Sequence, residues 1–169
     1  MPLNDTRMSV SVRSRLTTVL PLAVGEVPLT FERGVALDNG TAANQADRIW
    51  HSSGQIAASS FADIDLNGSL TDPFGAAVNL LRVKGLFISA APGNTNNLVV
   101  GNAAANGFIS WVGAAAHTLT IRPGGFLALW APDATAYAVT AGTADILRIT
   151  NSGGGSVVSY DLVIIGASA

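Results

Sequence analysis

The second half of the chain alternates short apolar segments with short breaks rich in Pro, Gly, Asn and Ser. Apolar segments lie at residues 119–121, 125–130, 146–149 and 157–165, and the breaks between segments include Pro-Gly-Gly, Ala-Pro-Asp and Ser-Gly-Gly-Gly. Short strands separated by such turns are typical of an all-β sandwich or barrel. We therefore predict about eight to ten strands and no long helix.

Residues 78–90 have the pattern of a strand inside a sheet. Val83 and Phe87 fall on one face, whereas Leu86 and Ile88 point the other way. Because both faces are apolar, we expect this strand to be covered on both sides. Further strands are expected at residues 48–52, 55–66, 98–100, 108–112, 117–122, 126–130, 137–140 and 146–150, and a last strand includes residues 158–164. A break of phase in the second of these segments indicates a bulge or a bend.

Residues 1–25 differ from the rest of the chain, because they alternate Ser, Thr and Arg without a helical stripe. Basic residues followed by the apolar residues 16–24 have some likeness to a secretory signal peptide, but the apolar part is short and contains Pro21. We predict an extended N-terminal arm over residues 1–25 and a β-sandwich over residues 26–169. The first strand of the sandwich is expected at residues 27–35, where apolar and polar side chains alternate.

The composition adds an excess of apolar residues that one small core does not need. Apolar residues make up 49% of the chain and charged residues 12%, about half the usual charged fraction. No apolar run approaches the ~20 residues of a membrane-spanning helix, so we predict no membrane partner. An obligate subunit interface resembles a domain core cut in half. The excess therefore favours a chain that forms oligomers.

The charge balance argues against nucleic acid as a direct partner. The formal net charge is −2, Lys84 is the one lysine, and the eight arginines are scattered along the sequence. A protein that neutralises phosphates needs a basic stripe or patch, which this pattern lacks.

Few residues suggest chemistry. The chain has no cysteine, which excludes disulfides and thiolate nucleophiles. His51 and His117 have no ligand at metal-binding spacing, although His51 with Asp63 and Asp65 would make a site if their strands were neighbours. The two aspartates share a strand face, so they suit either Ca²⁺ binding or the solvation of a strand end, and we favour the second. No Gly-x-Ser-x-Gly motif is present. We therefore predict no catalytic residue, no cofactor, no metal site and no enzymatic activity.

Aromatic and arm residues are the best candidates for protein contacts. Trp50, Trp111 and Trp130 would serve in the core, in an interface or as a sugar-binding platform, and tryptophan is favoured at the centre of interfaces. The predicted interface residues are Arg13, Leu16, Leu20, Leu22, Trp50, Trp111 and Trp130.

Several turn-and-strand motifs carry a family resemblance over about residues 60–166. Residues 64–75 read Ile-Asp-Leu-Asn-Gly-Ser-Leu-Thr-Asp-Pro-Phe-Gly and are followed by Leu-Arg-Val-Lys-Gly-Leu at residues 81–86. The tail adds Ile-Arg-Pro-Gly-Gly, Ala-Pro-Asp and Ile-Thr-Asn-Ser-Gly, and it ends with Tyr-Asp-Leu-Val-Ile-Ile-Gly. The chain resembles small β-rich virion proteins that tailed bacteriophages and prophages encode in their structural-gene clusters, and in particular jelly-roll capsid decoration (cement) proteins.

The resemblance implies a role but no catalytic motif. It implies a jelly-roll-like antiparallel sandwich on the outer capsid surface of the virion, often a dimer or trimer, that braces the major capsid protein and stabilises the shell. The residues 1–25 would then reach a neighbouring subunit. The alternative is a tail- or fibre-associated β-sandwich that binds a host surface glycan through Trp and Asp side chains.

Overall fold

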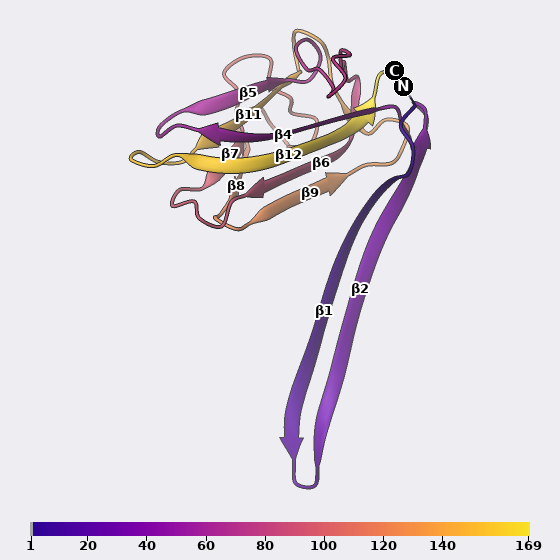
Figure 1. The fold of residues 1–169 in the computed structure, drawn as a ribbon, viewed down its shortest axis with the longest axis vertical. Coiled ribbons are helices and arrows are strands. Elements are labelled where there is room, and N and C mark those ends of the chain that lie inside the picture. Colours follow the sequence, from indigo (N-terminus) through magenta and orange to yellow (C-terminus); the bar gives the residue numbers. More distant parts are fainter. Residues whose placement is uncertain (1) are drawn as a thin grey trace.

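The computed structural model describes residues 2–169, which form a β-sandwich and a long β-hairpin that projects from one end of it (Figure 1). The hairpin consists of β1 (Thr6–Leu20) and β2 (Ala23–Asn39), and the short strand β3 (Gln45–Ala46) runs parallel to the end of β2. The predicted all-β sandwich with an N-terminal arm is confirmed. We call residues 9–34, the part of the hairpin beyond the sandwich, the hairpin arm.

One sheet of the sandwich contains five strands in antiparallel pairs. β12 (Val158–Ala167) lies between β4 (Arg48–Ile56) and β6 (Arg82–Ala90). The far side of β6 pairs with β9 (Phe126–Trp130) and, near its start, with the short β10 (Tyr137–Ala138). β6 is therefore an interior strand, and its register places Leu86 and Ile88 on the core side and Phe87 on the outer side.

The second sheet has four strands in the order β5, β11, β7 and β8. Their bounds are Phe61–Asp65, Ile146–Asn151, Leu98–Gly101 and Thr118–Ile121. The chain passes between the two sheets repeatedly, and the last strand returns to lie beside the first strand of the sandwich. Without β10, the orders β4-β12-β6-β9 and β5-β11-β7-β8 are those of a jelly roll, which places eight strands in two packed sheets.

Alternating side chains of both sheets fill the space between them. The largest apolar side chains of this core are almost fully buried: Leu66, Leu80, Leu86, Ile88, Leu98, Leu147, Ile149, Leu162 and Ile164. Because β12 contributes Leu162 and Ile164 and pairs on both edges, it is, like β6, an interior strand of its sheet.

The structure corrects the expected boundary at residue 25. β2 pairs with β1 along its whole length, so the strand expected at residues 27–35 belongs to the hairpin and has no partner in the sandwich sheets. The physical reason is that alternation shows which side chains share a face but does not show which strand supplies the hydrogen bonds.

Two other strand predictions need correction. Residues 108–112 form a loop with turns and not a strand. The Phe108 side chain is buried in the core at 2% exposure, and the Phe108 carbonyl oxygen accepts a hydrogen bond from Trp111 Nε1 at 3.0 Å instead of from a neighbouring strand. The segment 55–66 is divided between the end of β4 and β5. Ser59, at a φ of 55°, lies in the bend between them, which explains the break of phase. Within residues 2–169 the structure has no helix of a length and apolarity that would cross a membrane.

The interior strand β12 gives a direct test of the core. We expect Leu162→Ala to lower the free energy of unfolding by roughly 2–5 kcal/mol, because it leaves a cavity between the sheets. Urea unfolding measures this loss. The matched control is Val157→Ala beside the same strand, where a 51% exposed side chain should change stability by less than about 0.5 kcal/mol. Equal losses in the two variants would contradict the assigned core.

Candidate interaction surface: the hairpin arm

The hairpin arm is a continuous two-stranded ladder. Its register runs without a shift from Thr6 opposite Leu37 to Leu20 opposite Ala23, and Pro21 and Leu22 form the turn. At ~3.3 Å per residue, the part beyond the sandwich is about 40 Å long. Figure 1 shows that it leaves the sandwich near the two chain termini and points away from both sheets.

Both strands of the arm alternate in phase with each other, so their apolar side chains meet on one face. Residues directly opposite in an antiparallel pair share a face. The apolar face of the arm is formed by Val10, Val12, Leu16, Leu20, Ala23, Val27, Leu29 and Phe31. These side chains are exposed, with Leu16 at 73%, Val27 at 64% and Leu29 at 55%. The arm therefore carries an uncovered surface with the composition of a core.

The opposite face of the arm is polar and electrically balanced. Arg13 contacts Glu32 at 2.7 Å, and Arg15 contacts Glu26 at 3.4 Å. Ser11 Oγ also donates to Glu32. Exposed ion pairs of this kind contribute at most about 1 kcal/mol each. Their main effect is to keep this face soluble, which leaves the apolar face as the surface that gains most from burial.

One charged side chain interrupts the apolar face. Arg33 lies opposite Val10, and its guanidinium group stacks over the Phe31 ring at 4.8 Å from the ring centroid. At the tip both faces become apolar, because Val19 and Val24 oppose each other on the polar side and Leu22 is fully exposed in the turn.

The base of the hairpin packs against the outer face of the five-stranded sheet. Met8 and Leu37 are 3% exposed and form a second small core with Ala46 and Ile165. The Met8 sulfur lies over Gly85 of β6, where an added Cβ would meet it at 2.5 Å. The absence of a side chain at Gly85 therefore allows the hairpin to approach the sheet closely.

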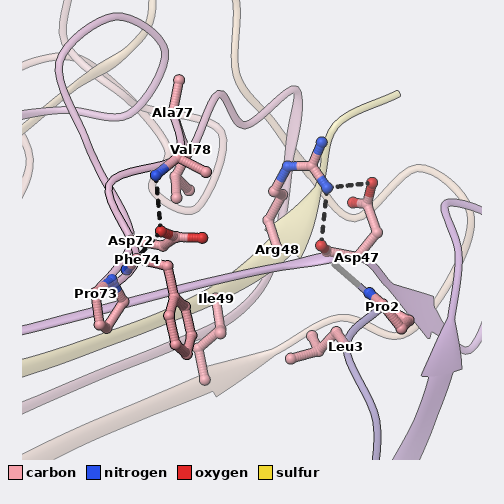
Figure 2. Close-up of a pocket in the computed structure, with 11 residues that line it drawn as sticks. Pro2, Leu3, Asp47, Arg48, Ile49, Asp72, Pro73, Phe74, Ala77 and Val78 are labelled. Atoms are coloured by element: carbon pink, nitrogen blue, oxygen red, sulfur yellow. Dashed lines mark hydrogen bonds and ion pairs between the residues drawn. The ribbon is translucent and has the colours of Figure 1, made fainter.

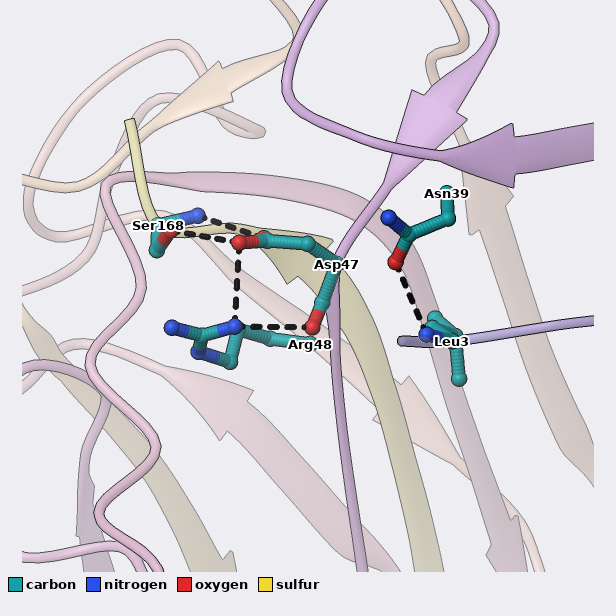
Figure 3. Close-up of polar contacts among 5 residues, drawn as sticks. All are labelled: Leu3, Asn39, Asp47, Arg48 and Ser168. Atoms are coloured by element: carbon teal, nitrogen blue, oxygen red, sulfur yellow. Dashed lines mark hydrogen bonds and ion pairs between the residues drawn. The ribbon is translucent and has the colours of Figure 1, made fainter. Parts of the chain in front are cut away.

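Polar contacts fasten the same region (Figure 3). The Asp47 carboxylate accepts hydrogen bonds from Ser168 N at 2.9 Å and Ser168 Oγ at 2.6 Å, and Arg48 donates to it at 3.0 Å. Asn39 Oδ1 accepts a hydrogen bond from Leu3 N at 2.8 Å, which joins the start of β1 to the end of β2. These bonds join the N-terminal segment to the end of the hairpin, and the C-terminal residues to the start of β4.

Lys84 supports the loops behind this base. Its side chain is fully buried, and Nζ donates to the carbonyl oxygens of Asp133 and Ala42. Burial lowers the pKa of the Lys84 ammonium group, and the nearby Asp133 carboxylate opposes this shift. The side chain of Lys84 thus holds two loops together through their carbonyl oxygens.

A shallow hollow of about 280 Å³ lies beside the base (Figure 2). Figure 2 shows the Phe74 ring beside Ile49, and Phe74 is 78% exposed. The Asp72 carboxylate at its edge accepts backbone hydrogen bonds from Phe74 and Ala76, so it stabilises its own loop. The hollow extends the apolar surface and has the character of a contact surface, not of a polar ligand site.

The outer face of the five-stranded sheet carries a second apolar area, which we call the outer patch: Ile49, Phe87, Phe126 and Val163. The register places these side chains on one face, and the rings of Phe87 and Phe126 stack with centroids 6.3 Å apart. Phe126 is 61% exposed. A groove of about 510 Å³ lies between the outer patch and residues 3–9 of the N-terminal segment, which run along the base of the hairpin.

The predicted interface residues occupy different environments. Leu16, Leu20 and Leu22 are exposed on the arm, and Arg13 lies on its polar face. Trp50 and Trp111 pack partly buried against the main core, and Trp130 packs against the small core under the hairpin. Trp50 and Trp130 point to opposite faces of their sheet, so they do not form a shared platform. β2 was missed as part of this surface, although its alternation from Val27 to Phe31 was visible in the sequence.

The candidate polar residues are separated or already paired. Asp63 forms two hydrogen bonds with Arg148, at 2.7 and 2.6 Å, and Asp65 Oδ1 accepts a hydrogen bond from Asn67 N. His51 lies on β4 of the other sheet. Among residues 2–169, no three His, Asp or Glu side chains are grouped closely enough to hold a metal ion.

The fastening of the base is testable at Asp47. We expect Asp47→Ala to lower the free energy of unfolding by about 1–3 kcal/mol, because Ser168 and Arg48 lose their acceptor. Urea unfolding gives the size, and hydrogen exchange should show faster opening of residues 165–169. Asp38→Ala on the exposed end of β2 is the control. A loss in the control as large as that of Asp47→Ala would count against this role.

The burial of Lys84 predicts its reactivity. We expect an amine-reactive ester to leave Lys84 unmodified in the native protein and to modify it after unfolding in urea, because the folded side chain is 0% exposed. Peptide mass spectrometry measures the modification. Arg122→Lys supplies an exposed amine as a matched control that should react in both states. Rapid native modification of Lys84 would overturn the assigned burial.

Comparison with known proteins identifies no relative that carries a similar surface. No protein-family model, curated protein or solved structure matches the chain. The functional argument therefore depends on the fold and on the exposed apolar surfaces described above.

Proposed function

We propose that this chain is a structural protein of a multi-subunit particle, and specifically a capsid decoration protein that uses its hairpin arm to bind a neighbouring subunit. The observation that carries the proposal is the apolar face of the arm, which extends about 40 Å from the sandwich and has no cover within the chain. Surfaces of this kind mark interaction sites in soluble proteins.

The size of the effect supports a partner for the arm. Burial of one large apolar side chain contributes about 1.5–3 kcal/mol. The side chains of this face together offer on the order of 10 kcal/mol, which is comparable with the entropic cost of association. An isolated two-stranded hairpin is at best marginally stable in water. Contact with a partner would therefore stabilise the folded hairpin and at the same time attach this chain to the partner.

The remainder of the molecule suits the same role. The jelly-roll sandwich has a well-filled core, and the base of the hairpin packs on its outer face so that the arm points outward. A protein that binds an assembled shell but not its separated subunits stabilises the shell by mass action. The major capsid protein on the outer surface of the virion is the proposed partner, with the fold resemblance as support by analogy only. The alternative of a glycan-binding tail module has less support, because Trp50 and Trp130 lie on opposite faces of their sheet.

Removal of the arm tests this function. Replacement of residues 10–33 by Asn-Gly would close the hairpin at Ser9 and Gly34 with a two-residue turn and would leave the Met8 and Leu37 base in place. We expect this variant to keep the sandwich fold and to lose co-sedimentation with capsids from which decoration proteins have been stripped. Circular dichroism and urea unfolding verify the fold.

Two point variants provide a matched comparison on one strand. Leu29→Asp puts a charge on the apolar face and should weaken capsid binding at least tenfold, whereas Thr30→Asp changes the polar face beside Arg13 and should bind normally. Undiminished capsid binding by the arm-deleted protein would refute the proposed function.

A further inference from the structure

Two uncovered apolar surfaces in one chain raise the question of whether they cover each other. The apolar face of the arm and the outer patch are both rich in branched aliphatic and phenylalanine side chains. The arm points away from its own sheet, so the two surfaces do not meet within one copy. A contact between them requires a second copy of the chain.

The hairpin base already shows that this sheet accepts this face of the hairpin. Met8 and Leu37 lie on the same hairpin face as Val12 and Phe31, and they bury against Ile165 beside Phe87 and Val163. The outer patch continues directly from this packed region across the groove. The packing of Met8 and Leu37 on this sheet is therefore the same kind of apolar contact that the arm of a second copy would make farther along the sheet.

The charges of the two surfaces are complementary. Arg33 is the one formally charged side chain that the register of β1 and β2 places on the apolar face beyond the base. Asp161 is the exposed charged side chain that β12 directs to the outer face beside the outer patch, whereas Lys84 of β6 is buried beneath the loop after β2. Arg33 and Asp161 are both exposed, and Asp161 lies two residues along β12 from Val163. Opposite charges at the edge of an apolar contact fix its register.

The areas favour exchange of arms over simple stacking of arms. One face of the free hairpin, about 40 Å long and ~10 Å wide, covers roughly 400 Å². Two arms that stack face to face would bury only that much per copy, about half of the ~800 Å² typical of a stable interface. When arms are exchanged, each copy buries two surfaces, its arm and its outer patch, instead of one.

We infer that two copies of this chain exchange arms, so that the apolar face of each hairpin arm packs on the outer patch of the other copy with Arg33 opposite Asp161. This inference rests on the proposed function and refines it: the subunit that covers the apolar face of the arm is a second copy, and the exposed tip around Leu22 is left for the capsid protein. The interface is isologous, since each copy offers the same two surfaces to the other. In this dimer each arm is ordered by contact with the other copy before the dimer binds to the particle.

Crosslinking tests the contact directly, because the chain has no cysteine of its own. Full-length Val12→Cys and Ser89→Cys variants, distinguished by a mass tag, are mixed and treated with a short bis-maleimide. We expect tagged heterodimers that join arm to sheet. Thr30→Cys, on the polar face of the same hairpin, is the matched control and should give at least tenfold less product with Ser89→Cys. Crosslinks that join Val12→Cys only to itself would indicate stacked arms and overturn the inference.

Charge reversal gives an independent readout. We expect Arg33→Glu and Asp161→Arg each to weaken dimerisation about tenfold or more in sedimentation experiments, and the double variant Arg33→Glu/Asp161→Arg to recover it. Arg15→Glu, on the polar face, should dimerise like the unmodified chain. A monomeric unmodified protein whose arm is still needed for capsid binding would refute arm exchange and leave the proposed function intact. Arm-independent capsid binding, by contrast, would refute the proposed function.

Discussion

The in-phase alternation of β1 and β2 is the constraint on which the shape and surface of this protein depend. Each strand alternates polar and apolar residues with a period of two, and the register places Val12 opposite Phe31 and Leu16 opposite Val27. A slip of one residue in either strand would scatter the apolar side chains over both faces. The observed register gathers them on one face, and a two-stranded ribbon has no second layer in which to bury it.

The sandwich directs this ribbon into solvent. Met8 packs over Gly85, the hydrogen bonds of Asp47 join Ser168 to the start of β4, and Asn39 joins Leu3 to the end of β2. These contacts determine where the arm leaves the sheet. The structure shows where the many apolar residues of the chain lie. One part fills the core of the sandwich, and another part is exposed on the arm and on the outer patch.

These surfaces suit assembly by exchange of elements. The proposed arm exchange needs a flat apolar sheet face, and the chain itself offers one beside the base of the hairpin. Arg33 and Asp161 add a single charge to each side, which is sufficient to favour one orientation over its reverse. A dimer of the proposed kind would leave the apolar tip around Leu22 exposed for a further contact.

The local pattern of the sequence determined the class of fold and the identity of most strands. Turn residues and alternating segments predicted β4, β6, β8, β9, β11 and β12, because a strand that buries one face needs a period of two. Pairing was decided only by the tertiary structure. Residues 27–35 were correctly predicted as a strand but belong with β1, since periodicity does not name a partner. The apolar run at residues 108–112 forms turns, because Phe108 fills the core from a loop. The sides on which Trp50 and Trp130 lie, and the meeting of the hairpin base with the outer sheet face, likewise follow from strand order, which only long-range packing selects.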